Sequence, residues 1–195
     1  MQGQNFIFFG VAGSGKGTQA KILMDYLKNK NGTDTVYAYP GDEYRKLIAS
    51  GNYTSKLVKA SYDKGELQPD FLTNVLFANI LVSTLTPEKN IMADGYPRTL
   101  VQSQTLEMML KFFKRDNIKI IYIDIGEEEA IKRNLLRGRT DDTKEGMAKR
   151  LKEYRGNVVG AMEYFKGKNG YELFSINGEQ SVEDVHKDII KALGL

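Results

Sequence analysis

A glycine-rich stretch near the amino terminus has the residue types of a phosphate-binding loop. Gly10, Gly15 and Lys16 have the spacing of that motif, with an apolar run before them and a helical pattern after them. Glycines let backbone N–H groups turn toward an anion, and the amino end of the following helix adds a partial positive charge. Lys16 supplies a cation for the outer phosphates. The sequence therefore predicts phosphate binding at this loop.

A second candidate group follows another apolar run, at Asp94-Gly-Tyr-Pro-Arg98. An acid at the end of a strand beside a phosphate loop can hold Mg²⁺, usually through water molecules. Gly95 and Pro97 predict a tight turn that directs Arg98 back over the site. Asp94 is therefore the candidate metal-holding residue, and Arg98 is a candidate phosphate ligand.

Arginines gather in the second half of the chain. Arg133, Arg137 and Arg139 lie within seven positions, and Arg150 follows on the next helical pattern. Arg133 and Arg137 are four residues apart, so they share one helix face. Phosphoryl transfer needs cations placed around the transferring group more than it needs covalent chemistry from the protein. The loop lysine, the strand-end acid and these arginines together predict phosphoryl transfer.

Alternating strands and helices must position these groups. Five apolar runs predict strands at 5–9, 35–39, 90–93, 119–125 and 171–176. Amphipathic stretches predict helices at 17–29, 42–50, 53–64, 71–85, 101–115, 127–137, 144–165 and 182–193. The alternation predicts an α/β fold whose five-stranded parallel sheet is covered by helices on both faces, with ligands beyond the carboxyl ends of the strands. Three helices between the second and third strands exceed what a crossover needs and predict an inserted substrate-binding lobe.

Length and composition limit the class of protein. The chain of 195 residues is long enough for one domain, and its net charge of +3 suits phosphate ligands without indicating nucleic acid. It has no cysteine, which excludes disulfides and thiolate metal sites. No apolar run is long enough to span a bilayer, and the amino terminus lacks a signal pattern. We therefore expect a soluble cytoplasmic protein without a membrane partner.

With these motifs the chain resembles the adenylate kinases over essentially its whole length. The matching stretches are the loop 10–19, Gly41-Asp42 with Arg45, the turn 65–70, the segment 94–102 and the arginine-rich segment 133–150. The resemblance implies one P-loop kinase domain with a nucleoside-monophosphate-binding insertion at about 40–69 and a short lid at about 137–143. It implies reversible, Mg²⁺-dependent phosphoryl transfer from ATP to AMP, giving two ADP, by a monomer whose partners are nucleotides. The short lid and the absence of cysteine imply no structural zinc.

The resemblance also assigns roles to individual residues. It implies ATP binding by Gly13, Ser14, Gly15, Lys16, Gly17, Thr18, Arg133, Arg137 and Gln180. It implies AMP binding by Pro40, Arg45, Glu66, Leu67, Gln68, Gly95, Tyr96, Pro97, Arg98, Gln102, Arg139 and Arg150, with Gln102 reading the adenine edge. Catalysis is assigned to Lys16, Arg98, Arg137, Arg139 and Arg150, and Mg²⁺ to Asp94 through water.

Two positions depart from the family's pattern. Ala12 stands where a proline is usual, and Tyr39-Pro40 replaces a Ser-Thr pair, which removes a hydroxyl expected near the monophosphate base. A UMP/CMP kinase or a broad-specificity nucleoside monophosphate kinase is therefore the alternative. A noncatalytic nucleotide-binding protein is expected to lack some of the arginines. A switch GTPase is expected to carry an Asn-Lys-x-Asp motif, which this sequence does not contain.

Overall fold

The computed structural model describes residues 2–63, 66–137 and 144–195, and for residues 137, 144 and 145 it describes the backbone alone. The strands are β1 (Asn5–Phe9), β2 (Thr35–Ala38), β3 (Asn90–Asp94), β4 (Ile118–Asp124) and β5 (Tyr171–Asn177). The helices are α1 (Lys16–Asn31), α2 (Pro40–Ala49), α3 (Tyr53–Tyr62), α4 (Asp70–Thr84), α5 (Leu100–Phe112), α6 (Glu127–Arg137), α7 (Lys144–Glu153), the π-helical turn η1 (Tyr154–Val158), α8 (Val159–Glu163) and α9 (Val182–Leu193).

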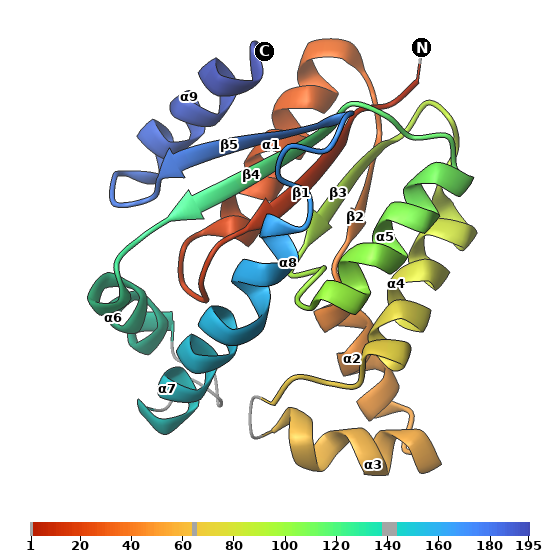
Figure 1. Cartoon of the computed structure of the whole chain (residues 1–195), viewed down its shortest axis with the longest axis vertical. Helices are drawn as coiled ribbons and strands as arrows, with labels where there is room; N and C mark the ends of the chain where they lie inside the picture. The colour runs from red at the N-terminus through yellow and green to blue at the C-terminus, as the bar shows by residue number, and fades with distance from the viewer. Residues whose placement is uncertain (1, 64–65, 138–143) are drawn as a thin grey trace.

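The five strands form one parallel sheet in the order β2-β3-β1-β4-β5 (Figure 1). In the centre of the sheet, Asn5 of β1 lies opposite Ile91 of β3 on one side and Ile118 of β4 on the other. Parallel strands need crossover connections, and here helices supply them on both faces. The predicted fold class is therefore confirmed. The carboxyl ends of the strands point toward the side of the molecule where α2, α3, α6 and α7 lie (Figure 1).

Each face of the sheet has its own hydrophobic core. In β1, Phe6 and Phe8 pack with α1 and α9, whereas Ile7 and Phe9 pack with α4, α5 and α8. Successive side chains of a strand point to opposite faces, so a strand covered on both sides must be apolar throughout. This requirement explains the continuous apolar runs in the sequence, and it places the loop after β1 at the end of a strand that is buried along its whole length.

Some element boundaries differ from the sequence prediction. β2 ends at Ala38 and α2 already begins at Pro40, because the fixed φ of proline suits the first turn of a helix. The helix predicted at 144–165 is divided by η1 into α7 and α8. Asp94 is the last residue of β3 and pairs in register with Phe8 of β1, so the sheet itself positions the candidate metal-holding acid. Within the described ranges, no helix is both long and apolar enough to cross a membrane.

Glu107 on α5 anchors the segment that follows α8. Its carboxylate accepts hydrogen bonds from Tyr164 and from Lys168 at 2.7 Å, and it pairs with Lys111 at 2.9 Å. These bonds, foremost the one from Lys168, hold the pKa of Glu107 at about 2. In an unfolded chain a glutamate titrates near pH 4.3. The ionised Glu107 carboxylate with its three partners therefore stabilises the fold fully above about pH 4.5, and this stabilisation is lost as the pH falls toward 2.

We expect Glu107→Gln to lower the free energy of unfolding at pH 7 by an amount on the order of 2–3 kcal/mol. The difference from wild type should narrow as the pH falls from about 5 to about 3, because the wild-type carboxylate is then protonated on unfolding. Urea unfolding at a series of pH values measures both quantities. Glu163→Gln, which removes an exposed partner of Lys166, is the control and should change stability little. A difference that stays constant with pH would contradict this assignment.

Candidate active site

The loop between β1 and α1 has the backbone geometry of an anion cradle. Gly10, Gly13 and Gly15 have φ angles of 146°, 89° and 92°, which side chains disfavour. Gly15 directly precedes α1 and has no side chain to cap it, so the N–H groups of the first helical turn point out of the helix end. Because this end carries a partial positive charge, it suits a phosphate group.

The side chain of Lys16 folds back over this loop. Its Nζ donates hydrogen bonds to the carbonyl oxygens of Gly10 (2.6 Å) and Val11 (2.9 Å) and lies 3.4 Å from Ser14 Oγ. Hydrogen bonds between two charged groups are stronger than those to a neutral carbonyl, so a phosphate oxygen is a better partner for this ammonium than the loop carbonyls. The loop therefore holds the Lys16 ammonium where a phosphate that binds can replace the loop carbonyls as its hydrogen-bond partner.

Asn134 on α6 holds the phosphate loop through a hydrogen bond to its backbone. The sequence analysis did not identify this residue. The residue is fully buried, and its Nδ2 donates to the carbonyl oxygens of Ala12 and Ala130, both at 2.7 Å. A Cβ on Gly13 would lie only 2.3 Å from the same Nδ2, so the contact also requires glycine at position 13. The sequence signal was an asparagine four residues after Ala130, on the face of α6 that packs inward.

We expect Asn134→Leu to weaken binding of the nucleotide at the phosphate loop, which the resemblance implies is ATP, about 5- to 30-fold. The apparent KM for AMP, the second nucleotide implied by the resemblance, should stay near its wild-type value. The variant removes the bond that holds the Ala12 carbonyl, and a buried hydrogen bond of this kind contributes about 1–2 kcal/mol. Calorimetric titration with ATP and steady-state kinetics with both substrates measure the two effects. Asn157→Leu, on the exposed surface, is the matched control. An equal loss of affinity for both nucleotides would instead indicate a general structural defect.

The carboxylate of Asp94 lies beside the first turn of α1. Asp94 is 5% exposed, and its Oδ2 would lie 3.1 Å from a Cβ placed on Gly17. Tyr37 of β2 donates its hydroxyl hydrogen to the same oxygen at 2.7 Å. Burial, with a smaller effect from Asp94, raises the pKa of Tyr37, so this phenol remains a donor. In the part of the chain that the structure covers, no cluster of three or more His, Cys, Asp or Glu side chains could hold a metal.

The side chain of Gln102 is held by bonds within the chain. Gln102 is 1% exposed; its Oε1 accepts from the backbone N–H of Arg98 and its Nε2 donates to Asp70 Oδ1, both at 2.8 Å. Thr99 donates its hydroxyl hydrogen to the same oxygen of Asp70 at 2.9 Å. Asp70 is therefore a second residue that the sequence analysis did not assign. An adenine that bonds to Gln102 must share or replace these partners.

The candidate monophosphate ligands Arg45 and Arg98 meet around the ring of Tyr39. Arg45 pairs with Asp42 and lies over the Tyr39 ring, 5.6 Å from its centroid. A Cβ on Gly95 would lie 3.1 Å from Arg98 Nη2 and 3.3 Å from Tyr39 Cε2. Arg98 also donates from Nε to the carbonyl oxygen of Gly95 at 2.8 Å. Tyr39, which departs from the family's pattern, therefore lines the space between the two candidate phosphate ligands Arg45 and Arg98.

Other members of the predicted AMP set contribute differently. The side chains of Pro40, Tyr96 and Pro97 are buried; Tyr96 stacks on Phe77 with ring centroids 4.0 Å apart, so it serves the core. Gln68 is held by Glu66 and Ser61, and the neighbouring Leu67 is half-buried. These residues can face a nucleotide with their backbone, whereas the exposed Arg98 can face it with its side chain.

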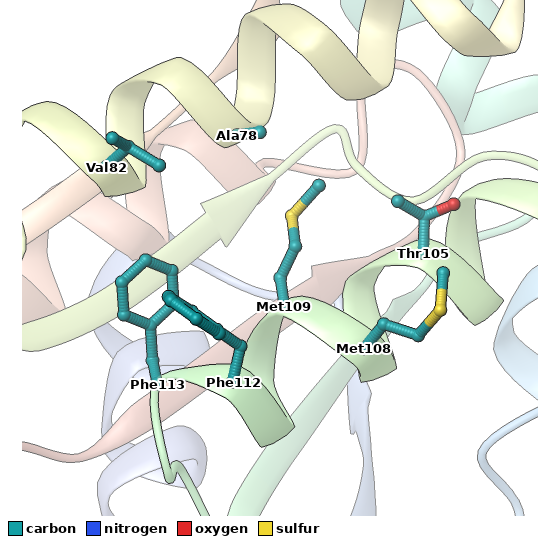
Figure 2. A pocket seen from close by; sticks show the side chains of 7 residues that line it. All are labelled: Ala78, Val82, Thr105, Met108, Met109, Phe112 and Phe113. Carbon is teal, nitrogen blue, oxygen red and sulfur yellow. The ribbon is translucent and has the colours of Figure 1, made fainter.

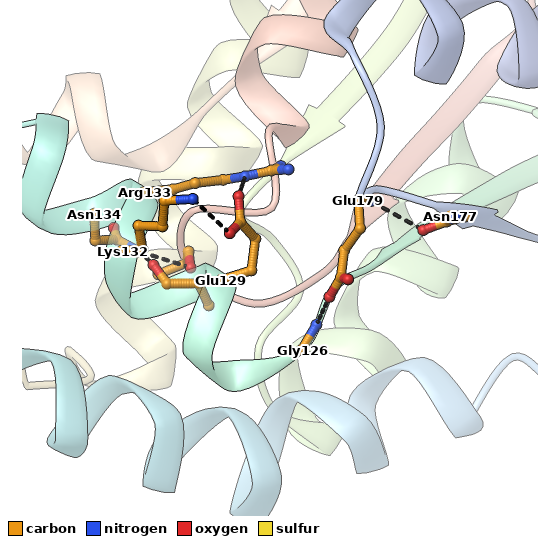
Figure 3. Close-up of polar contacts among 9 residues, drawn as sticks. Gly126, Glu129, Lys132, Arg133, Asn134, Asn177 and Glu179 are labelled. Carbon is orange, nitrogen blue, oxygen red and sulfur yellow. Dashed lines mark hydrogen bonds and ion pairs between the residues drawn. The ribbon is translucent and has the colours of Figure 1, made fainter.

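Of the predicted residues of the ATP base site, Arg133 lies in the second half of α6 and Gln180 lies in the loop after β5. Arg133 donates from Nε to Glu129 at 2.7 Å, and Figure 3 shows both side chains on the same side of the helix. Glu179, in the loop after β5, accepts a hydrogen bond from the backbone N–H of Gly126 at 2.6 Å (Figure 3). That bond ties the loop containing Gln180 to the start of α6. A polar hollow of about 380 Å³ lies here, lined by Asp124, Ile125, Gly126, Ser175, Asn177 and Glu179.

The arginines of the predicted lid are only partly described. Arg139 lies outside the described residues, and Arg137 ends α6 without a described side chain. Arg150 is on α7, with Nη1 3.8 Å from Met147 Sδ. The preceding residue, Lys149, forms an ion pair at 2.7 Å with Glu66, which belongs to the segment between α3 and α4. The helix after the lid therefore contacts the predicted monophosphate lobe directly.

The parallel sheet, the glycine loop with its lysine and the neighbouring strand-end acid define a P-loop kinase fold. Comparison with known proteins identifies the family. Residues 8–170 match the family model described as adenylate kinase. The chain is also similar to proteins named adenylate kinase from Bacteroides fragilis, 35% identical over 193 residues and 97% of each chain, and from Thermosipho africanus, 29% identical over 220 residues, 97% of this chain and 99% of the relative. A protein named adenylate kinase 1 from Nostoc is 31% identical over 188 residues, 96% of this chain and 97% of the relative.

The chain belongs to the adenylate kinase family. It is an enzyme of the nucleoside monophosphate kinase class, a phosphotransferase, and the predicted resemblance is confirmed. The names of these relatives do not favour a UMP/CMP kinase.

Proposed function

We propose that this enzyme transfers the γ-phosphoryl group of ATP reversibly to AMP, giving two ADP. The observation that best supports this reaction is the closeness of Asp94 to the phosphate loop, 3.1 Å from the position of a Cβ on Gly17. Lys16 lies at the same helix end. A cation for the phosphates and an acid for a metal ion are the two groups that a P-loop kinase combines at this point. The name adenylate kinase, which these relatives carry, agrees with AMP as the acceptor.

Asp94 fits the role of holding Mg²⁺ through water. Its carboxylate supplies the oxygen ligands that Mg²⁺ prefers, and a magnesium ion held by one carboxylate keeps several of its water molecules. When bound with the nucleotide, the ion neutralises charge on the phosphates. Tyr37 fixes the orientation of the carboxylate through its 2.7 Å bond. Because the chain has no cysteine, the proposal includes no zinc held by thiolates.

The remaining residues bind and orient the two nucleotides. We assign the ATP phosphates to the loop 13–18, and the ATP base to Arg133 and the backbone near Gln180. Arg45 and Arg98 hold the AMP phosphate, and Arg137, Arg139 and Arg150 surround the transferring group. The acceptor phosphate is already ionised, so the protein needs no general base and acts through positioning, charge and exclusion of water.

The proposed organisation is one domain with a monophosphate lobe at about 40–69 and a lid at about 137–143. Every group assigned to the reaction comes from one chain, so a monomer is catalytically complete. ATP and AMP are metabolites of the cytoplasm, and we place the enzyme there, with nucleotides rather than nucleic acid or membrane as its partners.

We expect AMP to be the best acceptor, with CMP, UMP and GMP accepted more readily than a strict adenine site would allow. The hydroxyl lost at Tyr39-Pro40 relaxes discrimination by about 0.5–1.5 kcal/mol, or about three- to tenfold. Coupled assays of kcat/KM for the four monophosphates measure this preference. The same assays on Gln102→Ala and Asp70→Asn should show a further loss of preference for AMP, because Asp70 orients the Gln102 amide.

Gln104→Ala provides the matched control, since Gln104 lies two residues further on α5 and is exposed. A wild-type enzyme that prefers UMP or CMP would overturn the proposed acceptor and leave phosphoryl transfer in place. An unchanged AMP preference in Gln102→Ala would show that other groups read the adenine.

A further inference from the structure

The peptide between Ala12 and Gly13 lies at the centre of a tight turn in the phosphate loop. The backbone N–H of Ser14 donates to the carbonyl oxygen of Val11 at 3.1 Å, which closes a turn of four residues. Gly13 has a φ of 89°, whereas the φ of Ala12 is negative. A closed turn with these angles is of type II. Type I and type II turns differ by about a half-turn rotation of the central peptide, so this peptide has two possible orientations.

Asn134 of α6 fixes which orientation the central peptide takes (Figure 3). Its Nδ2 donates to the carbonyl oxygens of Ala12 and Ala130, both at 2.7 Å. The peptide between Ala12 and Gly13 is trans, and in a trans peptide the C=O and N–H bonds point in opposite directions. Because Asn134 holds the carbonyl oxygen toward α6, the N–H of Gly13 points away from that helix.

The N–H of Gly13 is a donor that the loop itself does not use. Within the described ranges of the chain it has no hydrogen-bond partner. Lys16 Nζ lies in the same loop, bonded to the carbonyl oxygens of Gly10 and Val11. Backbone N–H groups of successive loop residues form anion-binding concavities when they point to one side. A donor without a partner beside a loop lysine is therefore suited to a phosphate oxygen.

The stability of the fold alone does not explain an asparagine at position 134. The side chain is fully buried, and its Oδ1 has no hydrogen-bond partner among the residues that the structure describes. Exchanging the two ends of the amide would place Oδ1 against two carbonyl oxygens, so the orientation with Nδ2 toward Ala12 and Ala130 is the better one. A buried oxygen without a donor is unfavourable, and a leucine of similar size would avoid it. The asparagine therefore points to a use of its bond to the loop.

We propose that Asn134 is a positioning residue that directs the N–H of Gly13 at the ATP phosphates, in place of the proline that is usual at position 12. Proline followed by glycine favours a type II turn, because its ring fixes φ near the value that the second position needs. Ala12 lacks this restriction, and the bond from Asn134 replaces it. With the peptide rotated, the carbonyl oxygen of Ala12 would face the phosphates and repel them. The inference rests on the proposed binding of ATP at this loop.

A double-mutant cycle between positions 12 and 134 tests this exchange of roles. Calorimetric titration with ATP compares the wild type, Asn134→Leu, Ala12→Pro and the double variant. We expect Asn134→Leu to weaken ATP binding about 5- to 30-fold when residue 12 is alanine, and less than about threefold when it is proline. Ala12→Pro alone should bind ATP like the wild type, because the N–H that proline removes has no partner among the described residues. Asn134→Ala, which is smaller, should give the same pattern as Asn134→Leu.

The amide signal of Gly13 reports the orientation of the peptide directly. In ¹⁵N–¹H NMR spectra, ATP should shift the amide proton of Gly13 downfield in the wild type and in the double variant, but not in Asn134→Leu. The KM for AMP should stay the same in all these proteins, which a general defect of the fold would not allow.

Thr105→Val is the matched control, because it also exchanges a hydrogen-bonding side chain for an apolar one. Thr105 accepts a hydrogen bond from Asn74 and lines an apolar groove between α4 and α5, which pack on the face of the sheet opposite α1 (Figure 2). The variant should leave ATP affinity unchanged whether residue 12 is alanine or proline.

Two results would overturn the inference while the proposed function stands. The first is a wild type that binds ATP together with an equal loss of affinity from Asn134→Leu in both backgrounds. The second is an amide of Gly13 that responds to ATP in Asn134→Leu as it does in the wild type. A wild type that does not bind ATP would overturn the proposed function, and the role of Asn134 with it.

Discussion

Lys16→Ala is expected to lower kcat/KM for ATP by at least about 10²–10³-fold while the protein stays folded. Removing one preorganised electrostatic group from a transition state typically costs this much. Lys16 is the cation that the loop holds over its own centre, 2.6 Å from the Gly10 carbonyl oxygen and 2.9 Å from that of Val11. Losing these two bonds should reduce the stability of the fold by about 1 kcal/mol, because a net hydrogen bond contributes little.

The controls for this substitution separate charge from structure. Lys21→Ala removes an exposed lysine from the same helix and should leave activity unchanged. Lys16→Arg keeps the charge but replaces a compact ammonium with a planar fork, so it should recover only part of the activity. Near-wild-type turnover by a folded Lys16→Ala protein would contradict the assignment of the phosphate loop. Urea unfolding and coupled-assay kinetics provide the two measurements.

Asp94→Asn is expected to lower kcat by about 10²–10³-fold, with little change in the binding of AMP. The substitution keeps the shape of the side chain and can retain the hydrogen bond from Tyr37, but it removes the negative charge beside the start of α1. Without that charge the site loses its hold on a magnesium ion, so higher Mg²⁺ concentrations should restore part of the rate. Kinetics over a magnesium titration measure both effects.

Two further variants test whether the charge of Asp94 is responsible. Tyr37→Phe removes the bond to Asp94 Oδ2 and keeps the carboxylate, so we expect a decrease of only a few-fold. Asp116→Asn removes an exposed acid that follows α5 and precedes β4, at the end of the sheet where the strands begin, and should have no effect. If Asp94→Asn turns over normally at low magnesium, the acid has a structural role only.

The buried strands, the glycine loop after β1 and the acid at the end of β3 could be predicted from the sequence. Buried strands in a two-sided parallel sheet must be continuous apolar runs, and the loop after β1 needs glycines for its positive φ angles, so both leave a signal in the chain itself. The position of Asp94 followed from the strand that carries it. These features depend on local geometry, which one stretch of sequence specifies.

Asn134, Asp70 and Tyr39 could not be predicted, because their roles depend on partners distant in the chain. Asn134 contacts a carbonyl 122 residues earlier, and Asp70 bonds to a glutamine 32 residues later. Tyr39 contacts Arg45 locally, but its contact with Gly95 arises only when β2 and β3 pair. The orientation of the Gln102 amide could not be predicted either, because it is fixed by hydrogen bonds to Asp70 and to the backbone N–H of Arg98.

The ion pair between Lys149 and Glu66 adds only a small preference for the arrangement in which α7 touches the monophosphate lobe. The proposed reaction requires nucleotides to enter between the monophosphate lobe and α7, and the pair spans these two parts. Both side chains are more than a third exposed, and such a pair contributes about 0–1 kcal/mol. The pair therefore shifts the ratio between the conformation in which α7 touches the monophosphate lobe and the conformation in which they are apart by at most about fivefold. The shift is smaller at higher ionic strength. An attraction this weak favours the conformation in which the two parts touch, but it does not trap either substrate or product.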